Sequence, residues 1–498
     1  MQIKTQNNLL LAIMVYNVSM VENIIARKKE CETLQESLES STSQLIIVYG
    51  RRRVGKTFLI NQFFDDNFSF KVTGIYNKPK ETQLEAFTRA LNFYFQLNLK
   101  VQTSWFDAFD ILKRSLANQK DKSKKSVIFF DELPWLDTQK SDFLPAFEWF
   151  WNDWGCAQNN LVCIVCGSAT SWMVDNIDHN KGGLFNRQNS RIYLEPFNLN
   201  ETREFLLTKN IDWSPYDIAE CYMVMGGIPF YLNLLKPKFS VSQNIDNIFF
   251  KKKGELWDEF EHLYHTLFSN SEAYIKVVEL LSTKRIGYSR QEISEKTKLA
   301  ANGKLSRILD NLVYSGFVRS YPFYGNKKKQ TLFQLCDYYT LFYFKFLREN
   351  AGHDENFWAN SYDNSSTKAW RGFTFEQMCK DHIQQIKQKL GISGVLSNES
   401  AWFVKADEEN DGAQIDMLID RRDHVVNVCE MKFSQDEFTI DKDYEQNLRR
   451  KISRFIDVSG TKKSIQLTFV TTYGVKKNMY SSRVTNQVVL NDLFKGLE

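Results

Sequence analysis

Three continuous apolar runs lie in the first half of the chain, at residues 45–49 (LIIVY), 126–130 (SVIFF) and 161–166 (LVCIVC). Runs of this length and composition are typical of strands that are buried on both faces of a parallel sheet. Helical patterns separate the runs, notably at 81–95 and 143–154. Strands that alternate with helices at this spacing predict an α/β fold with a parallel sheet.

The pattern changes after about residue 200, where the short buried runs stop. Residues 200–235 and 255–315 show helical periodicity, and two strand-like segments at 316–323 and 330–335 flank a turn at 324–329. Three helices followed by a hairpin are the outline of a winged helix.

The end of the chain has a mixed pattern. A polar stretch at 350–368 predicts a linker, and a helical pattern at 373–389 and a strand pair at 414–420 and 425–433 follow it. This mixture indicates a further α/β domain.

The composition is that of an ordinary globular protein of 498 residues, with 43% apolar and 25% charged residues. These values exclude a disordered chain, a collagen and a membrane bundle. The net charge of +4 is too small for the whole chain to be a nucleic-acid binder, so any basic surface must be local. Eight scattered cysteines form no disulfide framework, and they indicate a reducing cytoplasm.

The N-terminus carries the apolar segment 9–15, which is too short to span a bilayer and has no cleavage site after it. We expect residues 1–19 to be a short extension and the structured protein to begin near Met20. Met1 and Met20 are therefore both candidate starts, and no membrane association is expected.

Residues 50–57 (GRRRVGKT) match the P-loop pattern G-x-x-x-x-G-K-[ST], between an apolar run and a helical pattern. The glycines let backbone N–H groups surround phosphates, Lys56 would reach the β- and γ-phosphates, and Thr57 would bind Mg²⁺. The sequence therefore predicts an ATP site formed by Gly50, Arg51, Arg52, Arg53, Val54, Gly55, Lys56, Thr57 and Phe58.

The second apolar run ends in Asp131 and Glu132, as a Walker B strand does. Asp131 would hold Mg²⁺ through water, and Glu132 would polarise the attacking water. The alternative is a strand that simply stops at a charged turn. With a P-loop upstream, the catalytic interpretation is favoured.

The third run ends at residues 167–171 (GSATS), where Ser168 or Thr170 could sense the γ-phosphate or position water. A helix N-cap is the alternative. Arg187 is a candidate catalytic arginine, but it equally fits an exposed loop. The triple arginine at 51–53 also fits a solvated or interdomain face.

The segments IIVYGRRRVGKTFLI, VIFFDELPWL, CGSATSWM, LEPF and MGGIPFYL, in this order, resemble the archaeal-type ATPase family of the STAND/AAA-like P-loop NTPases. The resemblance extends from about Val21 to the end. That family often has Gly-Arg at two positions where this chain has Ala26-Arg27 and Asn186-Arg187. The resemblance implies an adenine-side contact at Arg27 and a role for Arg187, and the replaced glycines bear on both.

In that family the ATPase is commonly followed by a winged helix and a domain similar to PD-(D/E)XK nucleases. The resemblance therefore implies a multidomain α/β protein. Its parts would be an N-terminal extension (1–19), a P-loop ATPase domain with a parallel sheet and a helical lid (20–245), a winged helix (246–349), a linker (350–369) and an α/β restriction-endonuclease-like domain (370–498).

Asp416 and the segment 430–432 (EMK) have the spacing of a D…E-x-K motif. On a strand, Glu430 and Lys432 project to the same face, and a hairpin can bring Asp416 alongside. Two carboxylates can hold Mg²⁺, Glu376 could add a ligand, and Lys432 can orient or activate water. The spacing alone also fits an amphipathic surface hairpin. The resemblance favours the nuclease-like fold and leaves cleavage open.

Basic residues near the predicted hairpin are candidates for contact with DNA backbone phosphates. Lys304 and Arg307 lie on the preceding helix, and Lys327, Lys328 and Lys329 lie at the turn. Lysines at an exposed turn also keep a protein soluble, and winged helices also mediate protein contacts.

The sequence thus favours a cytoplasmic protein that hydrolyses ATP with Mg²⁺ and couples its nucleotide state to parts that act on DNA. The alternative is a nucleotide-operated regulator or scaffold whose nuclease-like domain is inactive, with a protein or a second copy of the chain as partner. A small-molecule kinase is less favoured, because Asp131 and Glu132 suit the activation of water and no substrate lid is evident.

Overall fold

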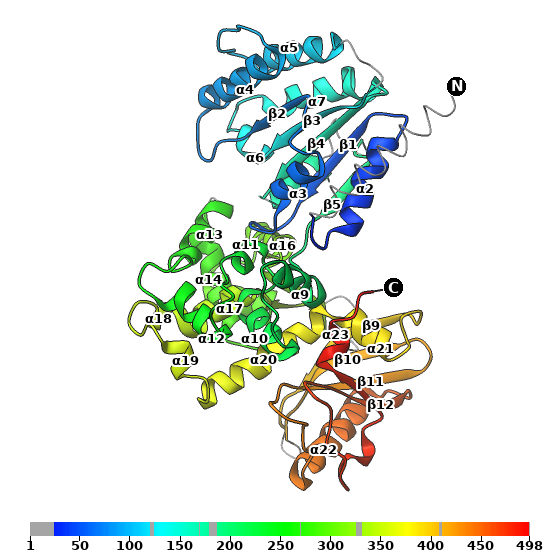
Figure 1. The fold of residues 1–498 in the computed structure, drawn as a ribbon. Helices are drawn as coiled ribbons and strands as arrows, with labels where there is room; N and C mark the ends of the chain where they lie inside the picture. The colour runs from blue at the N-terminus through cyan, green and yellow to red at the C-terminus, as the bar shows by residue number, and fades with distance from the viewer. Residues whose placement is uncertain are drawn as a thin grey trace, which may run out of the picture. The chain divides into compact units, whose positions relative to one another are not determined.

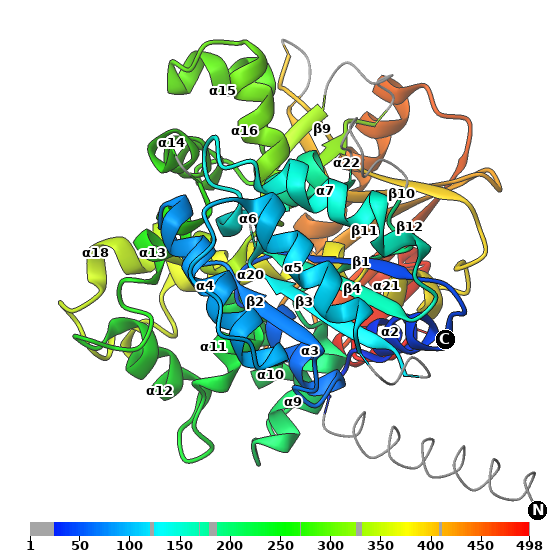
Figure 2. The ribbon, with the colours of Figure 1, turned by 90° about the horizontal axis from the view of Figure 1, so that it is seen from above.

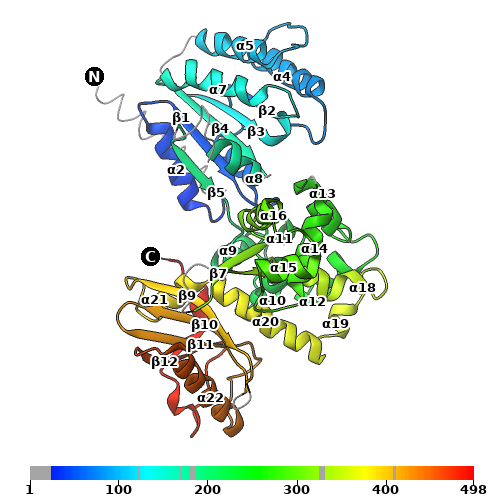
Figure 3. The same ribbon diagram turned by 180° about the vertical axis from the view of Figure 1, so that it is seen from behind.

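The computed structural model describes residues 24–119, 124–168, 170–178, 187–268, 270–324, 331–407 and 411–497. The chain forms two compact units, Met1–Pro196 and Phe197–Glu498. Figures 1, 2 and 3 show the ribbon from three directions. Within the described ranges, no helix has both the length and the apolar character needed to cross a membrane.

The first unit is built on a parallel five-stranded sheet in the order β2-β3-β4-β1-β5. Its strands are β1 (Gln44–Tyr49), β2 (Phe70–Thr73), β3 (Ser126–Asp131), β4 (Leu161–Gly167) and β5 (Ser190–Tyr193). β1, β3 and β4 coincide with the three apolar runs, and β3 and β4 are buried throughout. The chain leaves these three strands at one edge of the sheet, where α/β proteins bind ligands.

The helices of this unit are α2 (Lys28–Glu39), α3 (Lys56–Phe63), α4 (Lys80–Phe95), α5 (Trp105–Ala117), α6 (Leu133–Leu136), α7 (Phe143–Asp153) and α8 (Thr170–Met173). α4, α5 and α7 lie on one face of the sheet (Figure 3) and share one core with β1 to β4. Phe130 of β3 contacts Phe87 of α4, Phe109 of α5 and Phe147 of α7. Burial of each such ring contributes about 1.5–3 kcal/mol, so this core fixes β3 and the acids at its end.

The second unit begins with helices that the sequence assigned to the lid of the ATPase domain. They lie in the second compact unit, which begins at Phe197. The predicted extent of the ATPase domain, to residue 245, stays a prediction. They are α9 (Leu199–Thr208), α10 (Pro215–Met225), α11 (Pro229–Asn233) and α12 (Val241–Ile245). A buried ion pair of 2.5 Å between Arg371 and Glu220 joins α10 to a later helix of the same unit.

A second group of helices surrounds a small sheet. The helices are α13 (Glu259–Leu267), α14 (Ser271–Ser282), α15 (Arg290–Thr297), α16 (Gly303–Tyr314), α17 (Tyr338–Phe342) and α18 (Arg348–Asn350). The antiparallel sheet has the order β6-β8-β7, with β6 (Tyr288–Ser289), β7 (Val318–Pro322) and β8 (Thr331–Leu335). α14, α15 and α16, followed by β7 and β8, match the predicted succession of three helices and two strands, with one short strand added before α15.

Residues 350–369 differ from the predicted linker. They contain α19 (Phe357–Asn360) and the start of α20 (Ser365–Asp381), and Trp358 is fully buried. The carboxylate of Asp246 accepts the backbone N–H groups of Trp358 and Ala359 at 2.8 and 3.1 Å. The polar composition concealed this structure, because only a few side chains, among them Trp358 and Phe357, anchor the segment in the core.

The end of the chain forms a five-stranded sheet in the order β13-β12-β11-β10-β9. Its strands are β9 (Ser397–Val404), β10 (Ala413–Arg421), β11 (Val425–Lys432), β12 (Ser464–Thr471) and β13 (Asn486–Val489), and its helices are α21 (Ile383–Lys389), α22 (Lys442–Ser459) and α23 (Leu490–Leu493). β9, β10 and β11 pair antiparallel, whereas β11, β12 and β13 pair parallel. Leu448 and Phe455 of α22 pack in one core with Val426 and Val428 of β11.

His382 divides the predicted helix 373–389 into α20 and α21. Its ring is buried, with Nδ1 2.8 Å from the carbonyl oxygen of Met378, and Nε2 accepts the N–H of Leu199 at 3.0 Å. These two bonds use both nitrogens of a neutral ring. Burial lowers the pKa of His382, and this effect outweighs the hydrogen bond to Met378 and the charge of Asp381.

We expect the stability of the second unit to fall as the pH drops below about 6.5, because the unfolded chain then binds a proton that folded His382 resists. His382→Gln can still donate and accept, but it does not titrate. Thermal unfolding at several pH values is the measurement. The advantage of the wild type over the variant should shrink at acidic pH, and a constant difference across this range would contradict the assignment.

Candidate functional site

Two glycines, Gly50 and Gly55, let the backbone of the loop between β1 and α3 take conformations that other residues rarely adopt. Gly50 has φ +142°, and a Cβ there would lie 2.4 Å from the carbonyl oxygen of Leu194. Gly55 has φ +92° and precedes the first residue of α3. The loop therefore closes tightly against the end of β5, with its last residues at the helix N-terminus, where backbone N–H groups favour anions.

Lys56 is the first residue of α3 and is buried. Its Nζ donates to the carbonyl oxygens of Gly50 and Arg51 at 3.0 and 2.8 Å, so the side chain lies over the loop. Burial lowers the pKa of Lys56, and the charges of Asp131 and Glu132 act in the opposite direction. An ammonium group held in this position can bind phosphate oxygens that the loop surrounds.

Thr57 and Asp131 bring the loop and the end of β3 together. The Thr57 hydroxyl donates to the two carboxylate oxygens of Asp131 at 3.0 and 3.1 Å. Burial and the neighbouring Glu132 raise the pKa of Asp131, whereas the bond from Thr57 lowers it. A hydroxyl and a carboxylate are hard oxygen ligands, so the pair fits Mg²⁺, which takes one or two protein ligands besides phosphate oxygens and water.

Glu132 adopts a left-handed backbone conformation, with φ 46°, directly after β3. One of its carboxylate oxygens accepts the Ser168 hydroxyl at 2.8 Å, and the other accepts the Ser168 N–H at 3.2 Å. Ser168 follows β4, which lies between β1 and β3. Ser168 was predicted to sense a γ-phosphate or to position water. In the structure it contacts Glu132, the candidate general base.

The remaining predicted residues of this site differ in burial. Arg51 is buried, Arg52, Arg53 and Val54 are half-buried or buried, and Phe58 is exposed. The burial of Arg51 does not fit the alternative in which residues 51–53 form a solvated face. Arg187 is exposed and lies three residues before β5.

Arg27 ties the start of the described chain to this site. Its Nη2 donates to the carbonyl oxygen of Glu195 at 2.8 Å, and its Nη1 lies 3.7 Å from Glu30. The guanidinium is buried, and it also lies 3.4 Å from the carbonyl oxygen of Val54 in the loop. Arg27 therefore links the segment before α2 with the phosphate loop at Val54 and with the segment after β5 at Glu195.

The second candidate site lies at the end of β11 in the other unit. Glu430 is buried, and its carboxylate oxygens accept the Tyr444 hydroxyl and the Lys451 ammonium, each at 2.9 Å. Lys432 lies 3.6 Å from the same carboxylate. Since β10 pairs Met417 with Cys429, Asp416 is adjacent to Glu430 across the sheet.

The predicted metal set of Glu376, Asp416 and Glu430 is not gathered as expected. Among the described residues, no three His, Cys, Asp or Glu side chains come close enough together to hold a metal ion. Lys451 and Tyr444 are each bonded to one oxygen of Glu430, so a metal ion at Glu430 would compete with them. Burial and the neighbouring Asp416 raise the pKa of Glu376 to about 7.

Three residues of this cluster were not predicted from the sequence: Lys380, Tyr444 and Lys451. Burial, followed by the charge of Arg319, lowers the pKa of Lys380, while Glu376 and Asp416 oppose this. Tyr444 and Lys451 are seven residues apart on α22, a spacing that places both on one helix face. That spacing, on a helical pattern just after E-x-K, is the signal that could have identified them.

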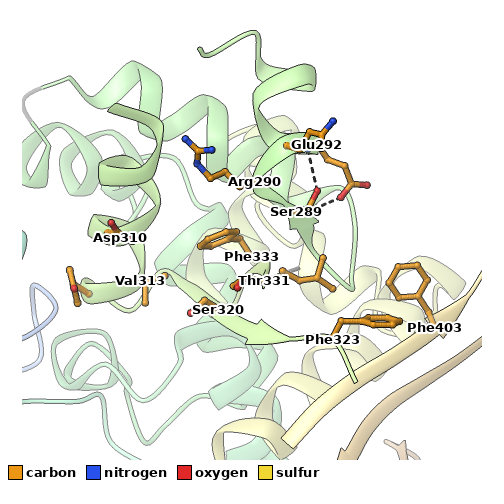
Figure 4. Close-up of a pocket in the computed structure, with 13 residues that line it drawn as sticks. Ser289, Arg290, Glu292, Asp310, Val313, Ser320, Phe323, Thr331, Phe333 and Phe403 are labelled. Atoms are coloured by element: carbon orange, nitrogen blue, oxygen red, sulfur yellow. Dashed lines mark hydrogen bonds between the residues drawn. The ribbon is translucent and has the colours of Figure 1, made fainter. Parts of the chain in front are cut away.

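The predicted DNA contacts are only partly within the described chain. Lys304 and Arg307 are exposed on α16, whereas Lys327, Lys328 and Lys329 lie outside the described residues. A cavity of about 910 Å³ lies between α15, α16 and the small sheet (Figure 4). Arg290, Asp310, Thr331 and Phe333 are among its lining residues, but it brings together none of the predicted contacts.

Part of the chain matches a known family. Residues 24–235 match a family described as "ATPase domain predominantly from Archaea". The uncharacterized protein MJECL04 of Methanocaldococcus jannaschii is 24% identical over 392 residues, which cover 77% of this chain and 82% of that protein. The uncharacterized ATP-binding protein MJ0423 of the same organism is 44% identical over 52 residues, or 10% of this chain and 83% of that protein.

Solved structures similar to the chain include the Walker-type ATPase of Pyrococcus abyssi, with a TM-score of 0.45 and 16% identity over 65% of this chain and 97% of that chain. The ORC2 protein of Aeropyrum pernix, solved as ADPNP–ADP complexes, has a TM-score of 0.38 and 15% identity over 63% of this chain and 90% of that chain. Likenesses at these scores add nothing to the assignment, which rests on the family match. The chain carries, in residues 24–235, an ATPase domain of this predominantly archaeal family.

Proposed function

We propose that the protein hydrolyses ATP with Mg²⁺ at the edge of the parallel sheet and passes its nucleotide state to a part that contacts DNA. The observation that supports hydrolysis most directly is the arrangement after β1, β3 and β4. There Thr57 is bonded to Asp131, and Glu132 is bonded to Ser168. A metal-binding pair and an adjacent general base are the groups that water attack on a phosphate requires.

Each residue then has a defined task. The loop N–H groups and Lys56 bind the phosphates, and Thr57 and Asp131 would hold Mg²⁺, which supplies charge neutralisation at the phosphate oxygens. Glu132 accepts a proton from the attacking water. Each of its carboxylate oxygens keeps a second lone pair, so Ser168 can orient Glu132 while it takes that proton.

The DNA-contacting part of the proposal is a winged helix formed by α14, α15 and α16 with the small sheet. Its support is the succession of these elements and the exposed Lys304 and Arg307 on α16. A helix that presents cations in this way can contact backbone phosphates without reading bases.

Lys304→Gln combined with Arg307→Gln is expected to weaken binding to duplex DNA by about 10-fold or more, and to reduce the slope of log affinity against log salt by about 2. Fluorescence anisotropy over a salt series measures both quantities. The exposed Lys276 of α14 provides a matched control, because Lys276→Gln removes a charge from another helix of the same group. Equal effects of the double variant and the control would refute the assigned surface.

A second function is favoured by one specific observation. We propose, as the alternative, that the C-terminal domain is nuclease-like but does not cut, so that the protein acts as a nucleotide-operated regulator. Its support is that Glu430 is already bonded to Lys451 and Tyr444. Nicking of a supercoiled plasmid separates the two proposals: cleavage that Lys432→Ala abolishes requires an active nuclease, and its absence favours the regulator.

A further inference from the structure

The contacts of buried Glu430 point to a specific role for the residues bonded to it. This inference assumes the nuclease-like interpretation of β10 and β11 given above, but it does not depend on ATP hydrolysis or DNA binding. Glu430 has a side chain only 1% exposed, and a carboxylate in such a place must be neutralised or hydrogen-bonded. Lys451 and Tyr444 provide this at 2.9 Å each.

Helix α22 holds Lys451 beside Glu430. It lies on α22, three residues after Leu448 and four before Phe455, and both of these apolar side chains pack in the core under β11. The lysine side chain is 22% exposed, so most of it is enclosed beside the carboxylate. An ammonium group in this position bonds directly to a buried acid that a metal ion would otherwise need.

Several lysines lie within electrostatic range of the carboxylates of this cluster. Glu376, Asp416 and Glu430 supply three acids, and the pKa shifts of this cluster include effects of Lys380, Lys432 and Lys451. A divalent cation that approached Glu430 would therefore compete with a tethered cation that is always present. Mg²⁺ and Mn²⁺ need one or two carboxylates besides water, and Glu430 with Asp416 would supply them if the lysine were absent.

We propose that Lys451 is the resident cation of the C-terminal site and keeps divalent metal ions from Glu430. Lys451 then blocks a metal site that the carboxylates of Glu430 and Asp416 would form, and displacement of Lys451 frees them to bind a metal ion. A neutral side chain at position 451 creates a metal site, whereas another cation there does not.

Mn²⁺ is the probe, and its binding to the full-length, nucleotide-free protein is measured by electron paramagnetic resonance. We expect Lys451→Met to gain about one bound Mn²⁺ per chain over the wild type. Lys451→Arg retains a cation and should gain none, and Lys451→Met with Asp416→Asn should lose the gained ion. The comparison with wild type removes any Mn²⁺ held by Thr57 and Asp131, which all four proteins share.

Thermal unfolding gives an independent readout. Loss of Lys451 leaves a buried carboxylate without its main partner, so Lys451→Met should unfold roughly 5–10 °C below wild type, and Mn²⁺ should restore most of this difference. Lys442→Met, which removes an exposed lysine from the same helix, should change neither value.

Two results would overturn the proposal. One is a Mn²⁺ ion bound to the wild type that Asp416→Asn removes, because Lys451 would then not exclude metal. The other is a folded Lys451→Met variant with no added Mn²⁺ and no stabilisation by it. Neither result bears on ATP hydrolysis, since the nucleotide site and its residues are the same in all these proteins.

Discussion

Glu132→Gln should lower the rate of ATP hydrolysis by about 10²–10⁴-fold while ATP binding is retained. Glutamine has nearly the shape of glutamate, and it can still contact Ser168, which now donates to both oxygens of Glu132 at 2.8 and 3.2 Å. It cannot accept a proton from water. The loss should therefore appear in the catalytic rate constant, with the Mg²⁺ pair of Thr57 and Asp131 intact.

Single-turnover phosphate release and binding of a fluorescent ATP analogue separate these two quantities. Ser168→Ala serves as the matched variant, because it removes one hydrogen bond to Glu132 but leaves the carboxylate. Its effect should be smaller than that of Glu132→Gln. Unchanged turnover in Glu132→Gln would show that another group activates the water.

Lys56→Ala is expected to weaken ATP binding by about 100-fold, which corresponds to about 3 kcal/mol, because a charge-assisted contact to the phosphates is lost. Hydrolysis should fall with it. The side chain also bonds the carbonyl oxygens of Gly50 and Arg51, so the variant must first be shown to unfold at a temperature near that of the wild type.

Isothermal titration with ATP and Mg²⁺ measures this effect. The exposed Lys100 offers a control on the same unit, and Lys100→Ala should bind ATP as the wild type does. If Lys56→Ala binds ATP with unchanged affinity, the phosphate site does not lie in the loop at 50–57.

The hydrophobic pattern was sufficient to predict the strands that position the nucleotide site. β1, β3 and β4 are buried on both faces, so their apolar runs leave little alternative to a central strand. The order of the strands was not predictable, because pairing across a sheet depends on contacts distant in sequence. β4 lies between β1 and β3, and this placement brings Ser168 to Glu132.

Other features depended on tertiary contacts that composition conceals. Residues 350–369 are polar on average, yet Trp358 is fully buried and Asp246 anchors its backbone. The C-terminal motif was proposed from its spacing, and the pairing of β10 with β11 places Asp416 beside Glu430. Their partners Tyr444 and Lys451 were missed. The spacing of seven residues places both on one helix face, but which lysine meets Glu430 depends on how α22 packs on the sheet.

The central claim is that hydrolysis at Glu132 is coupled to DNA contact in the second unit. Steady-state phosphate release with Mg²⁺ and ATP, with and without duplex DNA, tests it most directly when the wild type is compared with the Lys304→Gln, Arg307→Gln double variant. We predict that DNA raises the rate of the wild type and raises that of the double variant much less. Phosphate release that DNA leaves unchanged in the wild type would contradict the coupling.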